Sequence, residues 1–260
     1  MDGSEDRFYH PRITHRKDLA PNLWTIRIAP GGEFSFTPGQ YATLGLFDAN
    51  GKRRERPYSI ASSPHESELE FFFELVPGGD LTPLLYQLQP GDPMLMRKTS
   101  KGRFTLDFER DRKNHLLIST VTGVAPFVSY ARTLHRDWKN GKFSGEHKLF
   151  LLNGASRSWE LGYSEELQTL AREVPWLEYV PTISRPWEDE KWSAETGRAD
   201  DILRKYTDQW GLNGNNSVAY LCGHPEMVEH CKGILKRIGF AKEFTKEEVY
   251  WVPTQEAAAS

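Results

Sequence analysis

The residues best suited to hold a ring cofactor follow one another in the string Arg56-Pro57-Tyr58-Ser59. A guanidinium can pair with two oxygens of a diphosphate, and a flat aromatic ring can stack on a ring cofactor. The hydroxyl of Ser59 can hydrogen-bond a ring nitrogen. The same string also suits an edge strand with one exposed arginine, and residue chemistry alone favours that simpler interpretation.

The first hundred residues are patterned as short strands separated by turns. Residues 23–28 alternate apolar with polar side chains, and residues 40–46 and 70–76 are rich in aromatic or branched side chains. Proline–glycine turns punctuate these runs, and Asn50-Gly51 suits a type I′ hairpin turn. The pattern predicts an antiparallel barrel or sandwich as the first domain, over residues 1–110.

From residue 111 to residue 260 the sequence alternates strands with helices. The runs that read as buried strands are 115–120, 148–155, 177–184 and 218–223. Helices are expected to begin near Pro126, Ser164 and Pro225. This order predicts a second domain with a parallel sheet covered on both faces, which binds ligands beyond the carboxyl ends of its strands.

Composition excludes several classes of protein. The 260 residues carry a net charge of -3, which gives no overall attraction to nucleic acid or to an anionic membrane. No apolar run reaches the length needed to span a bilayer, and the N-terminus shows no secretory signal. The two cysteines, Cys222 and Cys231, cannot supply a disulfide framework, a four-cysteine zinc site or an iron–sulfur cluster. We expect a cytoplasmic monomer without a metal, and any iron–sulfur centre would belong to a partner.

Several motifs in one order resemble those of the bacterial type of the ferredoxin/flavodoxin–NADP reductase family. The matching segments are Pro38–Tyr41, Arg56–Ser63, Gly79–Thr82, Leu88–Asp92, Thr120–Pro126, Leu221–Val228 and Tyr250–Trp251. The resemblance extends from about Trp24 to Trp251. It implies a two-domain β plus α/β protein, with an N-terminal FAD-binding antiparallel β-barrel and a C-terminal NADP-binding α/β domain.

The resemblance implies which residues bind FAD. They are Arg56, Pro57, Tyr58, Ser59, Asp80, Leu81, Thr82, Thr122, Tyr250 and Trp251. Arg56 would pair with the diphosphate, Tyr58 would stack on the flavin ring and Ser59 would hydrogen-bond flavin N5. Backbone amides of residues 80–82 would cradle the diphosphate. An ordinary helix start, with Thr82 as its N-cap, is the alternative there.

The resemblance also implies an NADP site at the ends of the parallel strands. Its residues are Thr122, Gly123, Ser156, Arg157, Ser184, Arg185, Arg198, Cys222, Gly223, Pro225 and Glu226. Arginines at these turns favour the 2′-phosphate of NADP over NAD, and Glu160 and Glu188 follow them closely. Val121 occupies a position where the family commonly has glycine. Val121 would therefore adopt an extended backbone or displace the ligand slightly.

The activity implied is hydride exchange between NADP(H) and flavin N5, coupled to single-electron exchange with ferredoxin or flavodoxin. The residues implied in that chemistry are Tyr58, Ser59, Cys222, Tyr250 and Trp251. Cys222 would lie near the nicotinamide and shape its approach, although a lone buried thiol is more often only core. An aromatic from Tyr250-Trp251 would cap one face of the flavin, with a final core strand as the alternative. The tail after Trp251 could also slow access of the nucleotide.

The basic run Lys52-Arg53-Arg54 is either a solvated turn or part of a docking surface for an acidic ferredoxin or flavodoxin. Alternative functions are a reductase component for an oxygenase or cytochrome, a free-flavin reductase, and a flavin-binding electron-transfer subunit that does not use pyridine nucleotide. Five tryptophans of the second domain are too scattered to form a stacking platform, and we interpret them as packing residues. They are Trp159, Trp176, Trp187, Trp192 and Trp210.

Overall fold

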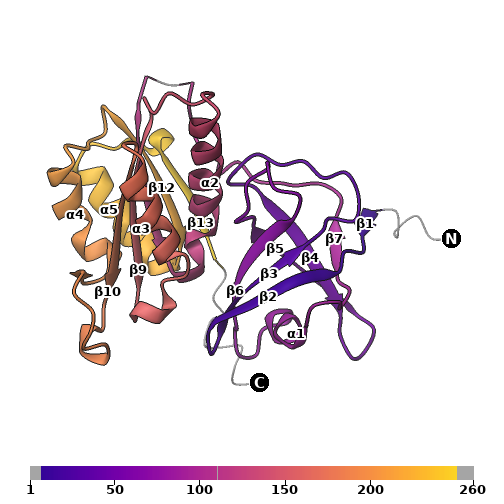
Figure 1. Ribbon diagram of the computed structural model, residues 1–260. Coiled ribbons are helices and arrows are strands. Elements are labelled where there is room, and N and C mark those ends of the chain that lie inside the picture. Colours follow the sequence, from indigo (N-terminus) through magenta and orange to yellow (C-terminus); the bar gives the residue numbers. More distant parts are fainter. Residues whose placement is uncertain (1–6, 110, 251–260) are drawn as a thin grey trace. The chain divides into compact units, whose positions relative to one another are not determined.

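The computed structural model describes residues 7–109 and 111–250. The chain divides into two compact units between Thr105 and Leu106. Figure 1 shows that one unit consists mainly of strands and the other of a sheet with helices on both faces. In the described part of the chain no helix is both long and apolar enough to cross a membrane.

The first unit contains two antiparallel sheets and one short helix. Its elements are β1 (Phe8–Tyr9), β2 (Ile13–Ala20), β3 (Leu23–Ile28), β4 (Tyr41–Phe47), β5 (Arg53–Ser59), β6 (Leu69–Glu74), α1 (Thr82–Gln87) and β7 (Leu95–Arg97). One sheet has the order β1-β7-β4-β5 and the other the order β2-β3-β6. The strand β5, which carries the cofactor string, therefore lies at the edge of its sheet.

Both sheets of the first unit contribute to one hydrophobic core. Trp24, Ile26 and Ile28 of β3 are almost completely buried, as the alternation of that segment predicts. Ala42 and Leu44 of β4 join the same cluster from the other sheet. The expectation of an antiparallel N-terminal domain is confirmed.

The hairpin between β4 and β5 forms, but its turn is not of type I′. Gly51 has a φ of +72°, whereas Asn50 does not have the positive φ that a type I′ turn requires at both central residues. The side chain of Asp48 organises the turn, because its Oδ1 accepts hydrogen bonds from the amides of Asn50 and Lys52 at 3.0 and 2.9 Å. The aspartate two residues before Asn50 decides the turn type.

The second unit is a six-stranded parallel sheet with helices on both faces. Its strands are β8 (Asn114–Thr120), β9 (Lys148–Ala155), β10 (Leu177–Ile183), β11 (Glu195–Thr196), β12 (Ser217–Gly223) and β13 (Thr245–Val249), and its helices are α2 (Ala125–Lys139), α3 (Ser164–Glu173), α4 (Ala199–Gln209) and α5 (Pro225–Arg237). Four short 3₁₀ turns complete it: η2 (Val121–Val124), η3 (Ser158–Glu160), η4 (Pro186–Glu188) and η5 (Lys242–Phe244). The predicted α/β domain is confirmed.

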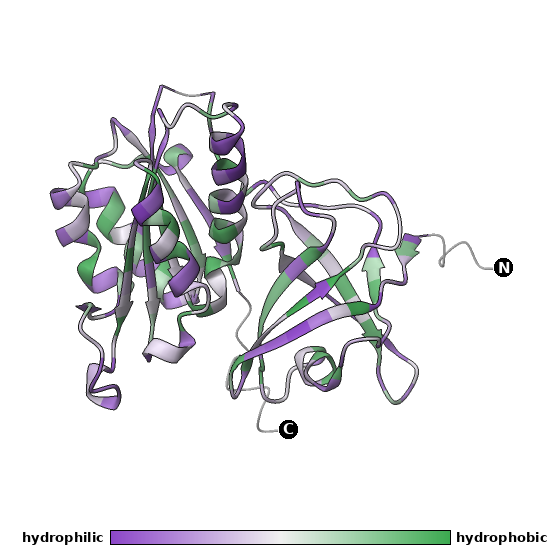
Figure 2. Ribbon diagram, in the orientation of Figure 1, coloured by the Kyte–Doolittle hydropathy of each residue, from purple (hydrophilic) through white to green (hydrophobic). Residues whose placement is uncertain are grey.

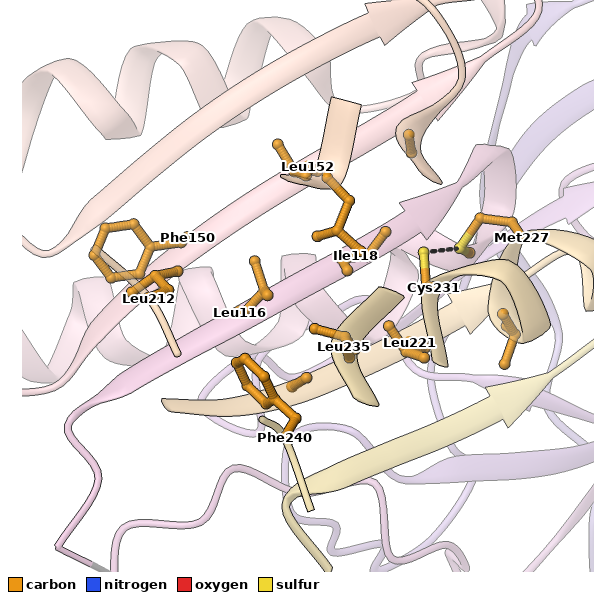
Figure 3. Packing of buried hydrophobic residues seen from close by; sticks show 14 of the residues in the cluster. Leu116, Ile118, Phe150, Leu152, Leu212, Leu221, Met227, Cys231, Leu235 and Phe240 are labelled. Atoms are coloured by element: carbon orange, nitrogen blue, oxygen red, sulfur yellow. Dashed lines mark hydrogen bonds between the residues drawn. The ribbon is translucent and has the colours of Figure 1, made fainter. Parts of the chain in front are cut away.

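The helices α4 and α5 cover one face of this sheet. Figure 3 shows Leu116 and Ile118 of β8 packed with Leu235 and Cys231 of α5, and the Cys231 thiol lies 3.6 Å from the sulfur of Met227. The helices α2 and α3 cover the opposite face (Figure 1). Figure 2 shows that the strands are mainly hydrophobic while the helices carry hydrophilic residues as well. Because both faces are covered, β8 is buried from His115 to Ser119, and its central residues 116–118 are apolar.

The strand order of the sheet is β11-β10-β9-β8-β12-β13. Strands β9, β10 and β11 follow one another on one side of β8. The chain then crosses over, and β12 and β13 lie on the other side of β8. The order therefore reverses between β8 and β12. In open α/β sheets the crevice at such a reversal, beyond the carboxyl ends of the strands, is where ligands bind. The turns after β8 and β12 are thus the expected place for a nucleotide.

Two histidines are paired at the opposite, amino edge of the sheet. His115 at the start of β8 is fully buried, and its Nε2 lies 2.9 Å from Nδ1 of His147, which precedes β9. Burial lowers the pKa of His115 to about 3, with the neighbouring His147 as a second cause. Burial also lowers the pKa of His147. The pair is not a metal site, since no group of three or more metal-ligating side chains occurs among the described residues.

Candidate functional site

The strand β5 carries the predicted flavin residues. Arg54, Arg56 and Tyr58 alternate with their neighbours and so share one side of the strand. The guanidinium of Arg56 donates to Asp80 Oδ2 at 2.9 Å, and Arg54 lies 3.5 Å from the other oxygen of that carboxylate. The side chain of Arg56 is 46% exposed. A guanidinium that already holds one exposed anion is chemically fitted to hold a diphosphate there.

Tyr58 and Ser59 end the strand on opposite sides. The ring of Tyr58 meets Phe73 edge to face at a centroid distance of 4.7 Å, and burial raises the pKa of its hydroxyl. The Ser59 side chain is buried. Pro57 is tolerated within the strand because β5 lies at a sheet edge. The string is thus an edge strand, as residue chemistry favoured, and it carries a guanidinium, an aromatic ring and a buried hydroxyl in succession.

The loop before α1 differs in one respect from the expectation. The N-cap position is occupied by Leu81, and Thr82 is the first residue of the helix. The Thr82 hydroxyl instead accepts a hydrogen bond from the Val76 amide at 3.0 Å. The prediction of Thr82 as N-cap is therefore wrong, because its hydroxyl hydrogen-bonds the backbone of the preceding turn and not the helix. The amides of Leu81 and Thr82 lie at the helix start, where no intrahelical carbonyl is available to them.

The turn after β8 is strained at Val121. Its φ of +45° lies in the left-handed region, so the expectation of an extended backbone is wrong. Such a conformation costs a β-branched residue about 1–3 kcal/mol. Gly123, two residues on, is packed against the backbone of the turn after β12: a Cβ placed on it would lie 2.3 Å from the carbonyl oxygen of Cys222. This close approach requires glycine at position 123.

Tyr250 connects both turns. Its amide donates to the Gly223 carbonyl at 3.1 Å, and its hydroxyl donates to the Thr122 carbonyl at 3.1 Å. The fully buried thiol of Cys222 lies beside the same hydroxyl, and burial raises the pKa of that thiol well above its ordinary value. Cys222 is therefore a neutral thiol and not a nucleophile at neutral pH. The structure brings Thr122, Gly123, Cys222, Gly223 and Tyr250 together, while Trp251 lies outside the described residues.

The helix α5 begins directly after the second turn. Pro225 is its first residue, and the imidazole Nδ1 of the N-cap His224 accepts a hydrogen bond from the amide of Glu226 at 3.3 Å. The proline suits this position, since the first helical amide has no intrahelical partner. Gly223 has a φ of +133°, and a Cβ there would lie 2.2 Å from the Thr120 hydroxyl. The predicted residues Gly223, Pro225 and Glu226 thus form one rigid turn.

The three candidate phosphate arginines follow neighbouring strands, and each holds a carboxylate. Arg157, after β9, is ion-paired with Glu188 and lies 3.1 Å from Glu160. Arg185, after β10, lies 3.5 Å from Glu188. Backbone hydrogen bonds from Ser184 to Ala155 and from Arg185 to Ser156 hold the ends of β9 and β10 side by side.

The third arginine lies at the start of α4. Arg198 Nε is 3.3 Å from the buried carboxylate of Asp200, and its Nη2 is 3.7 Å from Glu226. These carboxylates raise the pKa of the guanidinium. Sequence reasoning anticipated the arginines but missed that every one of them is already paired. The acidic residues within three positions of each arginine were the signal that could have shown it.

Two tryptophans flank the paired arginines. Trp187 in η4 is 73% exposed and Trp159 in η3 is 46% exposed. The guanidinium of Arg157 lies 5.8 Å from the centre of the Trp159 ring. The interpretation of these two as packing residues is wrong, because each stands in a short turn beyond its strand. Trp176, in contrast, is buried as expected.

Most of the basic run at the β4–β5 hairpin is neutralised within its own sheet. Arg53 pairs with Glu55 at 2.6 Å, and Arg54 pairs with Asp48 at 2.9 Å. Lys52 is exposed and has no ion-pair partner among the described residues. The run therefore contributes less net charge than its sequence indicates.

Comparisons with known proteins agree with the two units. Residues 12–106 match the model of the oxidoreductase FAD-binding domain, and residues 117–233 match that of the oxidoreductase NAD-binding domain. A flavodoxin/ferredoxin–NADP reductase of Buchnera aphidicola is 32% identical over 228 residues, which cover 86% of this chain and 88% of the relative. The toluate 1,2-dioxygenase electron transfer component of Pseudomonas putida is 27% identical, over 85% of this chain and 61% of the relative.

Among solved structures, a ferredoxin–NADP⁺ reductase from Neisseria gonorrhoeae with bound FAD and NADP has the same fold. The TM-score is 0.81 at 24% identity, over 94% of this chain and 99% of that one. The fold and the paired domains thus define an oxidoreductase that combines a flavin with a nicotinamide dinucleotide. More particularly, the chain belongs to the ferredoxin/flavodoxin–NADP reductase family, and FAD and NADP(H) are its expected cofactors, as the sequence predicted.

Proposed function

We propose that this protein exchanges a hydride between NADP(H) and FAD, and exchanges single electrons with a ferredoxin or flavodoxin. The observation that carries the proposal is the junction of two turns at the reversal of strand order. There Gly123 contacts the Cys222 backbone and Tyr250 hydrogen-bonds both turns. A flavin supplies the step from two-electron to one-electron chemistry when it is bound. Binding and orientation are the tasks of the protein's own residues.

On the flavin side, Arg56 binds the diphosphate and gives up or shares its pairing with Asp80. Tyr58 supports the flavin ring, and its own position is fixed by the edge-to-face contact with Phe73. Ser59 holds flavin N5 through its hydroxyl. Its burial excludes water that would compete for the hydrogen bond, so the donor is preorganised.

On the nucleotide side, the turn from Thr122 to Gly123 receives the dinucleotide, and Gly123 permits its close approach. The neutral, buried thiol of Cys222 limits the space beside the nicotinamide without attacking it. Arg157 and Arg185 bind the 2′-phosphate. The exposed ring of Trp187 offers a flat surface for the adenine next to them.

Ser59→Ala tests the role of the hydroxyl. We expect the rate constant for hydride transfer from NADPH to fall about tenfold or more, because a preorganised donor at N5 is lost. FAD affinity should change much less, since Arg56 and the diphosphate loop remain. Stopped-flow absorbance measures the first quantity and flavin fluorescence the second. Equal transfer rates in the variant and the parent would remove Ser59 from the mechanism.

We also propose that Lys52, Arg53 and Arg54 contribute to partner docking, with Lys52 as the main contributor because its charge is not compensated. Lys52→Glu should raise the KM for an acidic ferredoxin about two- to fivefold at low ionic strength, and the effect should vanish at high salt. Lys17→Glu, on the exposed side of β2, makes the same charge change on the other sheet and serves as the control. If both variants behave alike, docking lies elsewhere.

A second candidate function is that of a reductase component for an oxygenase. The similarity to the toluate dioxygenase component favours it. Steady-state rates with ferredoxin, flavodoxin, a cytochrome and free FMN distinguish the candidates. Our proposal expects ferredoxin or flavodoxin to give the highest kcat/KM, and a clear preference for another acceptor would replace it.

A further inference from the structure

The carboxylate of Glu188 lies between two arginines at the proposed phosphate site. One of its oxygens accepts a hydrogen bond from Arg157 Nε, and the other lies 3.5 Å from Arg185 Nη1. These two guanidinium groups are its only side-chain partners among the described residues. Arg157 and Arg185 come from the ends of different strands, β9 and β10, so Glu188 bridges the two elements.

Glu160 also contacts Arg157, but it has a different role. One of its oxygens accepts the backbone amides of Ser156 and Arg157 at 3.0 and 3.1 Å, so it is fixed as part of the turn. Glu188 has no such attachment through its carboxylate. A ligand could therefore displace Glu188 by breaking side-chain contacts alone, whereas displacing Glu160 would open the turn itself.

The arginines at this edge are neutralised without a ligand. Arg157 and Arg185 carry two positive charges, Glu160 and Glu188 carry two negative ones, and Asp189, which accepts a hydrogen bond from the Ser158 hydroxyl, adds a third negative charge. Arg157 lowers the pKa of Glu188, so this carboxylate is ionised at neutral pH. A 2′-phosphate, with a charge of about -1.5 to -2, competes with Glu188 for the two guanidinium groups. A free ribose 2′-hydroxyl, in contrast, can donate to a carboxylate, as in NAD-binding sites.

We propose that Glu188 determines nucleotide selectivity: it is the internal anion that the 2′-phosphate of NADP(H) displaces, and it accepts the ribose 2′-hydroxyl of NAD(H) when no phosphate is present. This inference rests on the proposed function, in which the nucleotide binds beside Arg157 and Arg185. It assigns this chain a weaker preference for NADP(H) than the arginines alone would give.

Glu188→Gln tests the proposal by calorimetric binding of two fragments, 2′,5′-ADP and 5′-AMP, to the FAD-loaded protein. Neither measurement depends on hydride transfer. We expect the variant to bind 2′,5′-ADP about tenfold more tightly than the parent does, because the negative charge that competes for both guanidinium groups is removed. Its affinity for 5′-AMP should stay equal or fall. The control is Glu190→Gln, which removes one exposed negative charge two residues away and has no ion pair among the described residues.

The outcomes distinguish a failure of the selectivity role of Glu188 from a failure of the proposed nucleotide site. If the ratio of the two affinities is the same in the parent, Glu188→Gln and Glu190→Gln proteins, the selectivity role of Glu188 is wrong while the binding site stands. If both acidic variants raise the ratio equally, the effect is general electrostatics and the specific role is again wrong. If the parent binds neither fragment, the proposed function fails at this edge, and the inference fails with it.

Discussion

Gly123→Ala is expected to reduce the rate constant for flavin reduction by NADPH at least about 100-fold, because a displacement of roughly 1 Å at a reacting pair can cost that much. The added Cβ would lie 2.3 Å from the carbonyl oxygen and 2.7 Å from the carbonyl carbon of Cys222. Both contacts are with backbone, which no side-chain rotation can relieve. The turns after β8 and β12 must therefore separate. Stopped-flow reduction at saturating NADPH measures the effect.

The Gly123→Ala protein should still bind FAD, because the proposed FAD-binding residues of β5 belong to the other unit. Gly233→Ala is the matched control. That glycine lies within α5, where the nearest atom to an added Cβ is the Arg237 guanidinium at 3.7 Å. We expect the control to reduce at the parental rate. A Gly123→Ala protein that does the same would show that the contact between the turns does not position the nucleotide.

The stability of the second unit is expected to decline on mild acidification through His115. This histidine has an ordinary pKa of about 6.5 when unfolded and about 3 when folded, because it is buried. The unfolded state therefore binds a proton more readily than the folded state does. The contribution of His115 to the free energy of unfolding is fully present above pH 6.5 and is lost as pH falls toward 3. Between pH 6.5 and pH 4.5 the loss should be about 2 kcal/mol from this group.

Hydrogen exchange of the β8 amides, corrected for the intrinsic rates, measures this loss in the whole protein. His115→Gln should remove about that much of the pH dependence, and His10→Gln, which removes an exposed imidazole of the first unit, should remove none. The titratable groups around the histidine pair are Tyr220, Lys113 and Glu146, with Asp107 and Lys246 nearby. An unchanged pH profile in the His115→Gln protein would mean that this histidine does not titrate on unfolding.

The architecture was predictable because periodicity reports burial directly. The alternation in residues 23–28 becomes β3, whose Trp24, Ile26 and Ile28 join the core. The strand expected over residues 115–120 becomes β8, which is buried along nearly its whole length. Turn geometry was less predictable. Asn50-Gly51 satisfies the rule for a type I′ turn, yet Asp48 organises a different one.

The site was predictable as a set of residues but not as a set of contacts. The left-handed backbone of Val121 contradicts local preference, and the packing of Gly123 on Cys222 joins two turns that are distant in the sequence. Tyr250 meets Thr122 across 128 positions of sequence. Contacts of this kind depend on strand order, which no local pattern reports.

The sequence alone also did not show which charged side chains contact each other. Glu188 is 31 positions from Arg157, and their contact exists because β9 and β10 are neighbours in the sheet. The exposure of Trp187 has the same origin, since it stands in a turn beyond the last residues of β10. The sequence shows that Glu188 is near Arg185, but only the fold shows that it also contacts Arg157.

The central claim is that this chain passes a hydride from NADPH to a bound flavin. Anaerobic titration of the FAD-loaded protein with NADPH, and separately with NADH, tests it most directly through the flavin absorbance. The account predicts complete bleaching near one equivalent of NADPH, with NADH also effective but at higher concentration because of Glu188. A flavin spectrum that neither nucleotide bleaches would contradict the account and would favour an electron-transfer subunit that does not use pyridine nucleotide.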